Sequence, residues 1–98
     1  MKKYEAEELA EELESLIGDY PGQDESRLHR CREIIGQIMY SQTDAYLREK
    51  ASTAIEFLGI WFSPRKWQRY GSPEQIRHLV LMDVKKLEMA LDRSFRER

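Results

Sequence analysis

Aromatic and basic side chains lie close together in residues 61–76, which read WFSPRKWQRYGSPEQI. Four aromatic residues are interleaved there with Arg65, Lys66 and Arg69. Nucleic-acid sites use aromatic rings to stack bases and clustered cations to bind phosphates. Protein-binding hot spots are also rich in Trp, Tyr and Arg. The segment is therefore interpreted in three ways: as a nucleic-acid or nucleotide-phosphate site, as a protein-binding surface, or as the connection between two helices.

A run of glutamates, EELAEELE at residues 7–14, is the second group with potential chemistry. It places Glu8 one helical turn from Glu11 or Glu12, as in magnesium-dependent helical nucleotide hydrolases. Such a site needs a second acidic pair on a facing helix, for which Glu88 with Asp92 is the candidate. Because the spacing is common and glutamates opposite a leucine stripe usually form a solvated face, we expect no metal site here.

The other potential nucleophiles and metal ligands are few and poorly spaced for catalysis. His29 and Cys31 are two residues apart, so on a helix they point to different faces. The sequence has no Glu-x-x-His motif of a di-iron bundle, and its glycines are scattered instead of forming a phosphate-binding loop. We therefore expect a protein that is not an enzyme, without cofactor or metal, in which Cys31 is a core residue and His29 a surface residue.

Length and composition indicate a single domain over residues 1–98, with 41% hydrophobic and 35% charged residues. The single cysteine excludes an internal disulfide and fits a reducing compartment. No apolar run approaches the roughly 18 residues that a membrane span needs, and no apolar signal segment follows the N-terminal lysines. We expect a cytoplasmic protein that does not contact a membrane.

The net charge of −2 hides an uneven distribution. Residues 1–25 hold two lysines against nine acids, whereas residues 26–98 hold fourteen lysines and arginines against nine acids. An acidic first helix can lie across the basic body and neutralise it, or it can present acid to one partner while the body presents base to another.

Apolar residues recur with helical spacing through almost the whole chain, and no segment shows the alternation of a strand. The sequence predicts an all-α, compact four-helix bundle with helices at about 3–17, 24–41, 43–62 and 72–95. Gly18 is the predicted C-cap of the first helix, Asp24 an N-cap of the second, and Ser72 with Gln75 a capping box for the fourth. The second and third helices are either separated by a tight turn at residues 41–43, which we favour, or form one bent helix.

Asp83 falls inside the apolar stripe of the predicted fourth helix, between Leu79 and Leu87. A carboxylate in that position is costly unless it is hydrogen-bonded or paired. We expect a donor such as Trp67, Tyr70 or Tyr46 beside it. The alternative is that Asp83 is a buried functional acid.

Met82 and Met89 lie seven residues apart on the opposite side of the same helix, flanked by Lys85, Lys86 and Arg93. Methionine adapts well to partner surfaces, and this spacing is used in helix-in-groove contacts. Residues 43–62 also carry a wide apolar arc. The chain therefore has more apolar surface than a monomer of this length hides comfortably, which favours a homodimer or a permanent protein partner.

The function expected from these features is that of a small non-enzymatic interaction protein, such as an adaptor, a regulatory subunit or an inhibitor. The alternative is nucleic-acid or nucleotide-phosphate binding through residues 61–77, which the net negative charge disfavours. The predicted partner-binding residues combine the aromatic and basic segment with the methionine strip: Trp61, Arg65, Lys66, Trp67, Arg69, Tyr70, Met82, Lys86 and Met89.

Overall fold

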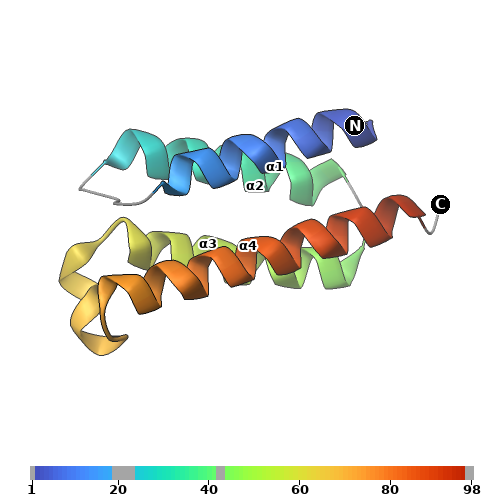
Figure 1. Ribbon diagram of the computed structural model, residues 1–98. Helices are drawn as coiled ribbons and strands as arrows, with labels where there is room; N and C mark the ends of the chain where they lie inside the picture. Colours follow the sequence, from blue (N-terminus) through green and yellow to red (C-terminus); the bar gives the residue numbers. More distant parts are fainter. Residues whose placement is uncertain (1, 19–23, 42–43, 97–98) are drawn as a thin grey trace.

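The computed structural model of the protein describes residues 2–18, 24–41 and 44–96. Four α-helices follow one another: α1 (Lys3–Ile17), α2 (Glu25–Ser41), α3 (Ala45–Trp61) and α4 (Pro73–Arg96), with a short 3₁₀-helix η1 (Pro64–Arg69) between α3 and α4. Helices α1 and α2 form one layer and α3 and α4 the other, and α1 begins at the end of the bundle where α4 ends (Figure 1). Within these ranges there is no strand, and the predicted all-α bundle is confirmed.

The core lies between the two layers. Each helix packs against the next one in the chain, and α4 closes the arrangement against α1. The α3–α4 pair is the most extensive of these contacts and the α1–α4 pair the least extensive. Fully burying a large apolar side chain contributes roughly 1.5–3 kcal/mol. The largest fully buried side chains are Leu13, Ile17, Ile34, Ile35, Ile38, Leu47, Leu58, Trp61, Ile76, Val80, Val84 and Leu87.

The predicted capping residues are confirmed. Gly18 has a left-handed φ of 61°, and its N–H donates to the Glu14 carbonyl at the end of α1. The Asp24 carboxylate accepts from the Arg27 N–H at 3.1 Å. In the capping box, the Gln75 N–H donates to the Ser72 hydroxyl at 3.3 Å and the Ser72 N–H donates to the Gln75 side chain at 2.9 Å.

Helices α2 and α3 are separate, as we favoured. The first ends at Ser41, and the second is capped by Asp44, whose carboxylate accepts from the N–H groups of Tyr46 and Leu47. Because Asp44 is the cap, α3 begins two residues later than predicted, and it ends one residue earlier, at Trp61. Residues 42–43 of the predicted turn, and residues 19–23 of the predicted loop after Gly18, lie outside the described residues.

The C-terminal end of α1 is bonded by three side chains from the other three helices. Trp61 donates its indole N–H to the Ile17 carbonyl at 3.0 Å. Arg27 donates to the carbonyls of Leu16 and Ile17, at 2.9 and 3.0 Å, and Arg77 to that of Gly18 at 2.9 Å. A helix end leaves carbonyls without intrahelical partners and carries partial negative charge, which these donors satisfy. We call Arg27, Trp61 and Arg77 the α1 clamp.

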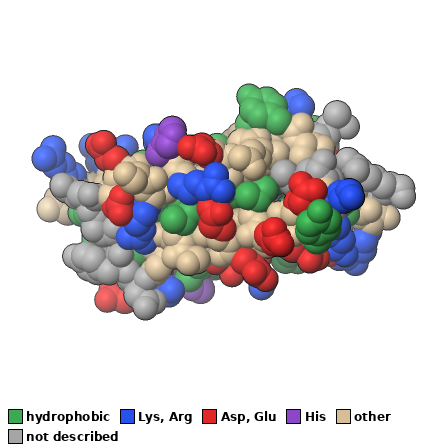
Figure 2. All heavy atoms as spheres, turned by 90° about the horizontal axis from the view of Figure 1, so that it is seen from above, with side chains coloured by type: hydrophobic (Ala, Val, Ile, Leu, Met, Phe, Trp, Pro, Cys, Tyr) green, Lys and Arg blue, Asp and Glu red, His purple; other side chains and the backbone are tan. Residues whose placement is uncertain are grey.

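Most apolar side chains lie on the inner faces of the helices, although several large ones, such as Tyr40, Tyr46 and Met89, are exposed. Among the described helices, none combines enough length and apolarity to cross a membrane. The α1–α2 side of the molecule carries acidic and basic side chains in alternation, with hydrophobic side chains only as separate groups (Figure 2). Many of these charges pair with one another: Arg30 of α2 bonds Glu12 of α1 at 2.9 Å and Glu33 at 3.3 Å.

Candidate partner-binding surface

The two tryptophans of the aromatic and basic segment turn inward. Trp61 is 1% exposed, and the ring of Trp67 stacks on it with a centroid distance of 5.7 Å and an interplanar angle of 20°. The indole N–H of Trp67 donates to the Ile60 carbonyl at 3.0 Å. Because Trp61 is in the core and Trp67 is half-buried on top of it, these two rings hold η1 on α3. The prediction that Trp61 belongs to the partner surface is therefore wrong, because its ring is buried in the core.

The basic residues of η1 remain at the surface. Arg65, Lys66 and Arg69 are exposed, and Tyr70 beside them is partly exposed. They line a shallow hollow together with Ile60 and the acidic Glu56 of α3. The hollow therefore combines cations with one carboxylate and a single accessible aromatic ring.

Asp83 lies among charged groups of α3 and α4. Partial burial raises the pKa of the Asp83 carboxyl, while nearby Lys86 and Lys50 lower it and Glu56 raises it further. The indole N–H of Trp67 bonds Ile60, so the expected donation from Trp67 to Asp83 is wrong. The sequence could not show this, because the charges that act on Asp83 come partly from α3, a different helix.

An exposed apolar face runs along α3 and α4. Tyr46 of α3 is 47% exposed, and Met82 and Met89 of α4 are 43% and 64% exposed. Tyr46 and Met89 line one hollow of about 690 Å³, whose rim includes Lys86 and Arg93. The Lys50 ammonium lies 5.1 Å from the centre of the Tyr46 ring and the Arg93 guanidinium 5.8 Å from it, within the range of cation–π attraction. We call this surface the Tyr–Met face, and it consists of Tyr46, Lys50, Met82, Lys86, Met89 and Arg93.

Part of this face was predictable from the sequence and part was not. Met82, Lys86 and Met89 were predicted from their spacing on one helix. Tyr46 was considered as a partner of Asp83 and as part of the wide apolar arc of residues 43–62, but not as a partner-binding residue. The signal that would have found it is the spacing of Tyr46 and Lys50, one helical turn apart at the start of α3, which brings a cation over an aromatic ring.

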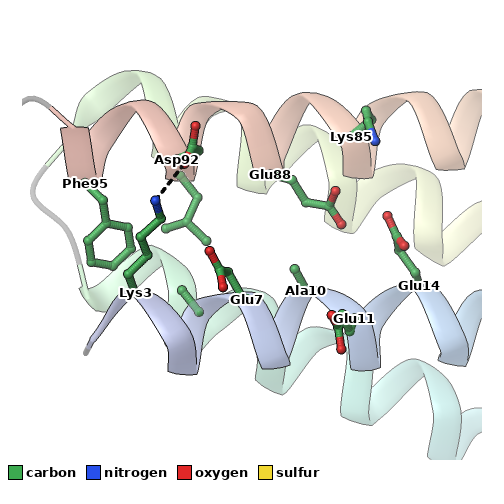
Figure 3. A pocket seen from close by; sticks show the side chains of 11 residues that line it. Lys3, Glu7, Ala10, Glu11, Glu14, Lys85, Glu88, Asp92 and Phe95 are labelled. Atoms are coloured by element: carbon green, nitrogen blue, oxygen red, sulfur yellow. Dashed lines mark ion pairs between the residues drawn. The ribbon is translucent and has the colours of Figure 1, made fainter.

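The carboxylates of α1 and α4 meet in a groove between the two helices. Glu7, Glu11 and Glu14 line it from α1, and Glu88 and Asp92 line it from α4 (Figure 3). The arrangement that a magnesium site would need does not form with Glu8 and Glu12, because Glu8 is not in the groove and Glu12 is on the α2 side of α1, where it bonds Arg30. Within the described ranges, no three His, Cys, Asp or Glu side chains are grouped so that they could hold a metal ion.

Two residues with potential reactivity have structural roles. Cys31 is fully buried, and burial raises the pKa of its thiol to about 11, so it is protonated at neutral pH and a poor nucleophile. His29 is at the surface, where its Nε2 lies 2.8 Å from the Glu33 carboxylate. Both placements confirm the sequence interpretation.

The nine predicted partner-binding residues thus fall into three groups. Trp61 and Trp67 pack together, Arg65, Lys66, Arg69 and Tyr70 lie on and just after η1, and Met82, Lys86 and Met89 join Tyr46 on the Tyr–Met face. The third group combines the most exposed apolar surface with a cationic rim. Comparisons of the chain with protein-family models, with curated proteins and with solved structures found no match.

Proposed function

We propose that this chain is a non-enzymatic interaction protein that binds an acidic amphipathic helix of a partner protein through the Tyr–Met face. The observation that carries the proposal is the exposure of Tyr46, Met82 and Met89 on two adjacent helices, within a rim of cations. Regulatory subunits, adaptors and inhibitors are the kinds of protein that act in this way.

The apolar part of the face suits a helix. Two helices packed side by side leave a shallow channel between them, and the hollow of about 690 Å³ beside Tyr46 and Met89 lies there. A docked amphipathic helix places its apolar side chains at i, i+3, i+4 and i+7, which matches the seven-residue spacing of Met82 and Met89. Methionine adapts its shape to a partner surface, and tyrosine buries a large area at little loss of conformational freedom.

The charged part of the face selects the partner. The cations around the apolar residues, Lys50, Lys86 and Arg93 among them, outnumber the acidic Glu88 and Asp92, and complementary charge fixes the orientation and raises the association rate of a partner. In a symmetric dimer through this face, each cation would approach the cations of the second copy. We therefore favour an acidic partner protein over the homodimer that the sequence also allowed.

The nucleic-acid alternative has less support. It requires exposed aromatic rings beside the cations, whereas Trp67 stacks on Trp61 and only Tyr70 remains accessible beside Arg65, Lys66 and Arg69. We further propose that the chain acts in the cytoplasm, since its only cysteine is a buried free thiol, as is common in a reducing compartment.

The experiment uses a fluorescent designed peptide with leucines at i, i+3, i+4 and i+7 and glutamates elsewhere, titrated with the protein and followed by anisotropy. The expected result is binding that weakens with salt and that falls about tenfold or more in Met89→Asp, because an aspartate removes apolar contact and repels glutamate. The triple variant Arg65→Ala, Lys66→Ala and Arg69→Ala is the matched control and should keep the affinity.

Three outcomes would overturn the proposal. The first is that a scrambled peptide of the same composition binds as tightly as the amphipathic one. The second is a dimer in light scattering that Met89→Asp dissociates, which would assign the face to a second copy. The third is a salt-dependent affinity for a single-stranded oligonucleotide that the triple variant abolishes, with no binding of the peptide.

A further inference from the structure

The groove between α1 and α4 is the least tightly closed seam of the bundle. Its volume is about 380 Å³, and the α1 residues at its floor, Ala6 and Ala10, are small. One ion pair crosses it near the start of α1, where the Lys3 ammonium lies 3.6 Å from the Asp92 carboxylate (Figure 3).

Two carboxyl groups converge in the middle of this groove. Glu88 points from α4 toward α1 and Glu14 points from α1 toward α4 (Figure 3). Protonated Glu88 donates a hydrogen bond to Glu14, and its pKa is raised to about 7 by burial, by this bond and by the negative charge of Glu14. Two carboxylates that approach each other in a partly buried site cannot both ionise without a large cost.

The other charges that face Glu88 do not remove this repulsion. The lining of the groove comes from α1 and α4: Glu7, Glu11 and Lys3 belong to α1, and Lys85 and Asp92 to α4. Lys85 favours the charged form of Glu88, although less strongly than burial and Glu14 oppose it. Lys3 is engaged with Asp92, whose pKa is lowered chiefly by its bond to Arg96. On the other flank of Glu88, Lys86, Arg93 and Arg96 line a second hollow, but Lys85 is the cation that lowers its pKa, and burial and Glu14 outweigh it.

The far end of α1 is held in a different way. Arg27, Trp61 and Arg77 of the α1 clamp bond the carbonyls of Leu16, Ile17 and Gly18. These donors are arginines and an indole, whose N–H groups keep their protons throughout the neutral pH range. The C-terminal end of α1 is therefore fixed by bonds that do not titrate near neutral pH, whereas Glu14, in the turn before it, faces the titrating Glu88.

We propose that the α1–α4 groove is a proton-controlled joint: a proton held between Glu14 and Glu88 keeps the two helices together, and its loss lets them separate between the Lys3–Asp92 pair and the α1 clamp. The separation opens the groove along Ala6 and Ala10 and exposes the apolar side chains behind them. Glu88 and Asp92 also line the hollow beside Tyr46 and Met89, so the joint adjoins the Tyr–Met face.

The direction of the pH effect follows from the raised pKa of Glu88. Between its ordinary pKa of 4.5 and about 7, folded Glu88 keeps a proton that the unfolded chain releases. The folded state then binds more protons, so the free energy of unfolding falls as the pH rises through this window. The contribution of the pair is complete below pH 4.5 and is lost above about pH 7.

The test compares Glu88→Gln and Glu14→Gln with the wild type and with Glu8→Gln, an exposed glutamate of α1 outside the groove, as the matched control. Each glutamine can hydrogen-bond across the groove at every pH. At pH 8 the Tm of Glu88→Gln and of Glu14→Gln should exceed that of the wild type by about 5 °C, a modest shift because Glu88 is partly exposed. At pH 4.5 the difference should disappear, and Glu8→Gln should follow the wild type at both pH values.

Hydrogen exchange at pH 8 shows which helices are affected. Because all proteins are compared at one pH, differences in exchange rate come from the substitutions. Amides of residues 3–14 should exchange more slowly in Glu88→Gln than in the wild type, whereas those of α2 and α3 should not change. The proposal is overturned if Glu88→Gln and the wild type share one Tm profile, if Glu14→Gln lacks the effect, or if exchange slows equally in all helices. The second result would mean that burial of Glu88 acts alone.

Discussion

The α1 clamp and the Tyr–Met face both combine aromatic and basic residues. In the clamp these side chains are bonded within the fold, whereas on the Tyr–Met face they are exposed to solvent. At the clamp, Trp61 is buried under Trp67, Arg27 and Arg77 bond helix carbonyls, and Arg27 lies over the Phe62 ring at 5.1 Å. On the Tyr–Met face, Lys50 and Arg93 lie against Tyr46, whose ring is about half exposed.

The difference lies in what the polar groups meet. The end of a helix presents several carbonyls that need donors, and an indole or guanidinium that reaches them becomes part of the framework. The Tyr46 ring and the two methionines face solvent, so their apolar area remains available to a partner. Aromatic and basic composition therefore does not distinguish a structural cluster from a binding surface. What distinguishes them is whether the carbonyl end of a helix lies close enough to accept hydrogen bonds from the cluster.

The largest expected effect is that of Trp61→Ala. Removing the buried indole leaves a cavity and takes away one of the two donors to the Ile17 carbonyl, so the free energy of unfolding should fall by about 3–5 kcal/mol. Tyr46→Ala should cost less than about 1 kcal/mol, because Tyr46 is half exposed. Urea denaturation followed by circular dichroism measures the free energy of unfolding of both variants. Equal losses would contradict the distinction between a structural Trp61 and an exposed Tyr46.

A smaller difference in stability is expected between an arginine of the α1 clamp and an arginine of the Tyr–Met face. Arg77→Met keeps much of the aliphatic stem but removes the donor to Gly18, and it should lower the free energy of unfolding by about 1–2 kcal/mol. Arg93→Met, on the Tyr–Met face, should lower it by less than about 0.5 kcal/mol but weaken peptide binding, since a rim cation is lost. If Arg93→Met were the more destabilising of the two, Arg93 would belong to the framework.

The smallest effect concerns the tryptophan of η1. Trp67→Phe keeps a ring on Trp61 and removes the bond to the Ile60 carbonyl, so we expect a loss of about 1 kcal/mol in unfolding free energy. The affinity for the acidic peptide should not change, because Trp67 faces the core. An affinity loss comparable with that of Met89→Asp would show that η1 is part of the binding surface.

The helices could be predicted from the sequence because their signals are local. Asp24, Ser72 with Gln75, and Gly18 act on neighbours within four residues, and each has the predicted role. The outward placement of Met82 and Met89 also followed from the helical period alone.

The contacts between helices could not be predicted in this way. The period of α1 shows which residues are opposite the leucine stripe, but not which flank of the helix faces α2 and which faces α4. For that reason Glu12 was grouped with Glu8, although it bonds Arg30 of α2, while Glu14 faces Glu88 of α4. The stacking of Trp67 on Trp61 likewise depends on the path of η1, which no local pattern fixes.

We propose that the exposed aromatic and basic cluster on α3 and α4 binds a partner, while the cluster at the end of α1 supports the fold. The most direct measurement is a titration of ¹⁵N-labelled protein with the acidic amphipathic peptide, followed by amide chemical shifts. We predict that the largest shifts fall on Tyr46, Lys50, Met82, Lys86 and Met89, with little change at residues 65–70 or on α2. Shifts centred on residues 65–70 or on the α1–α2 side, or no shifts at all, would contradict the account.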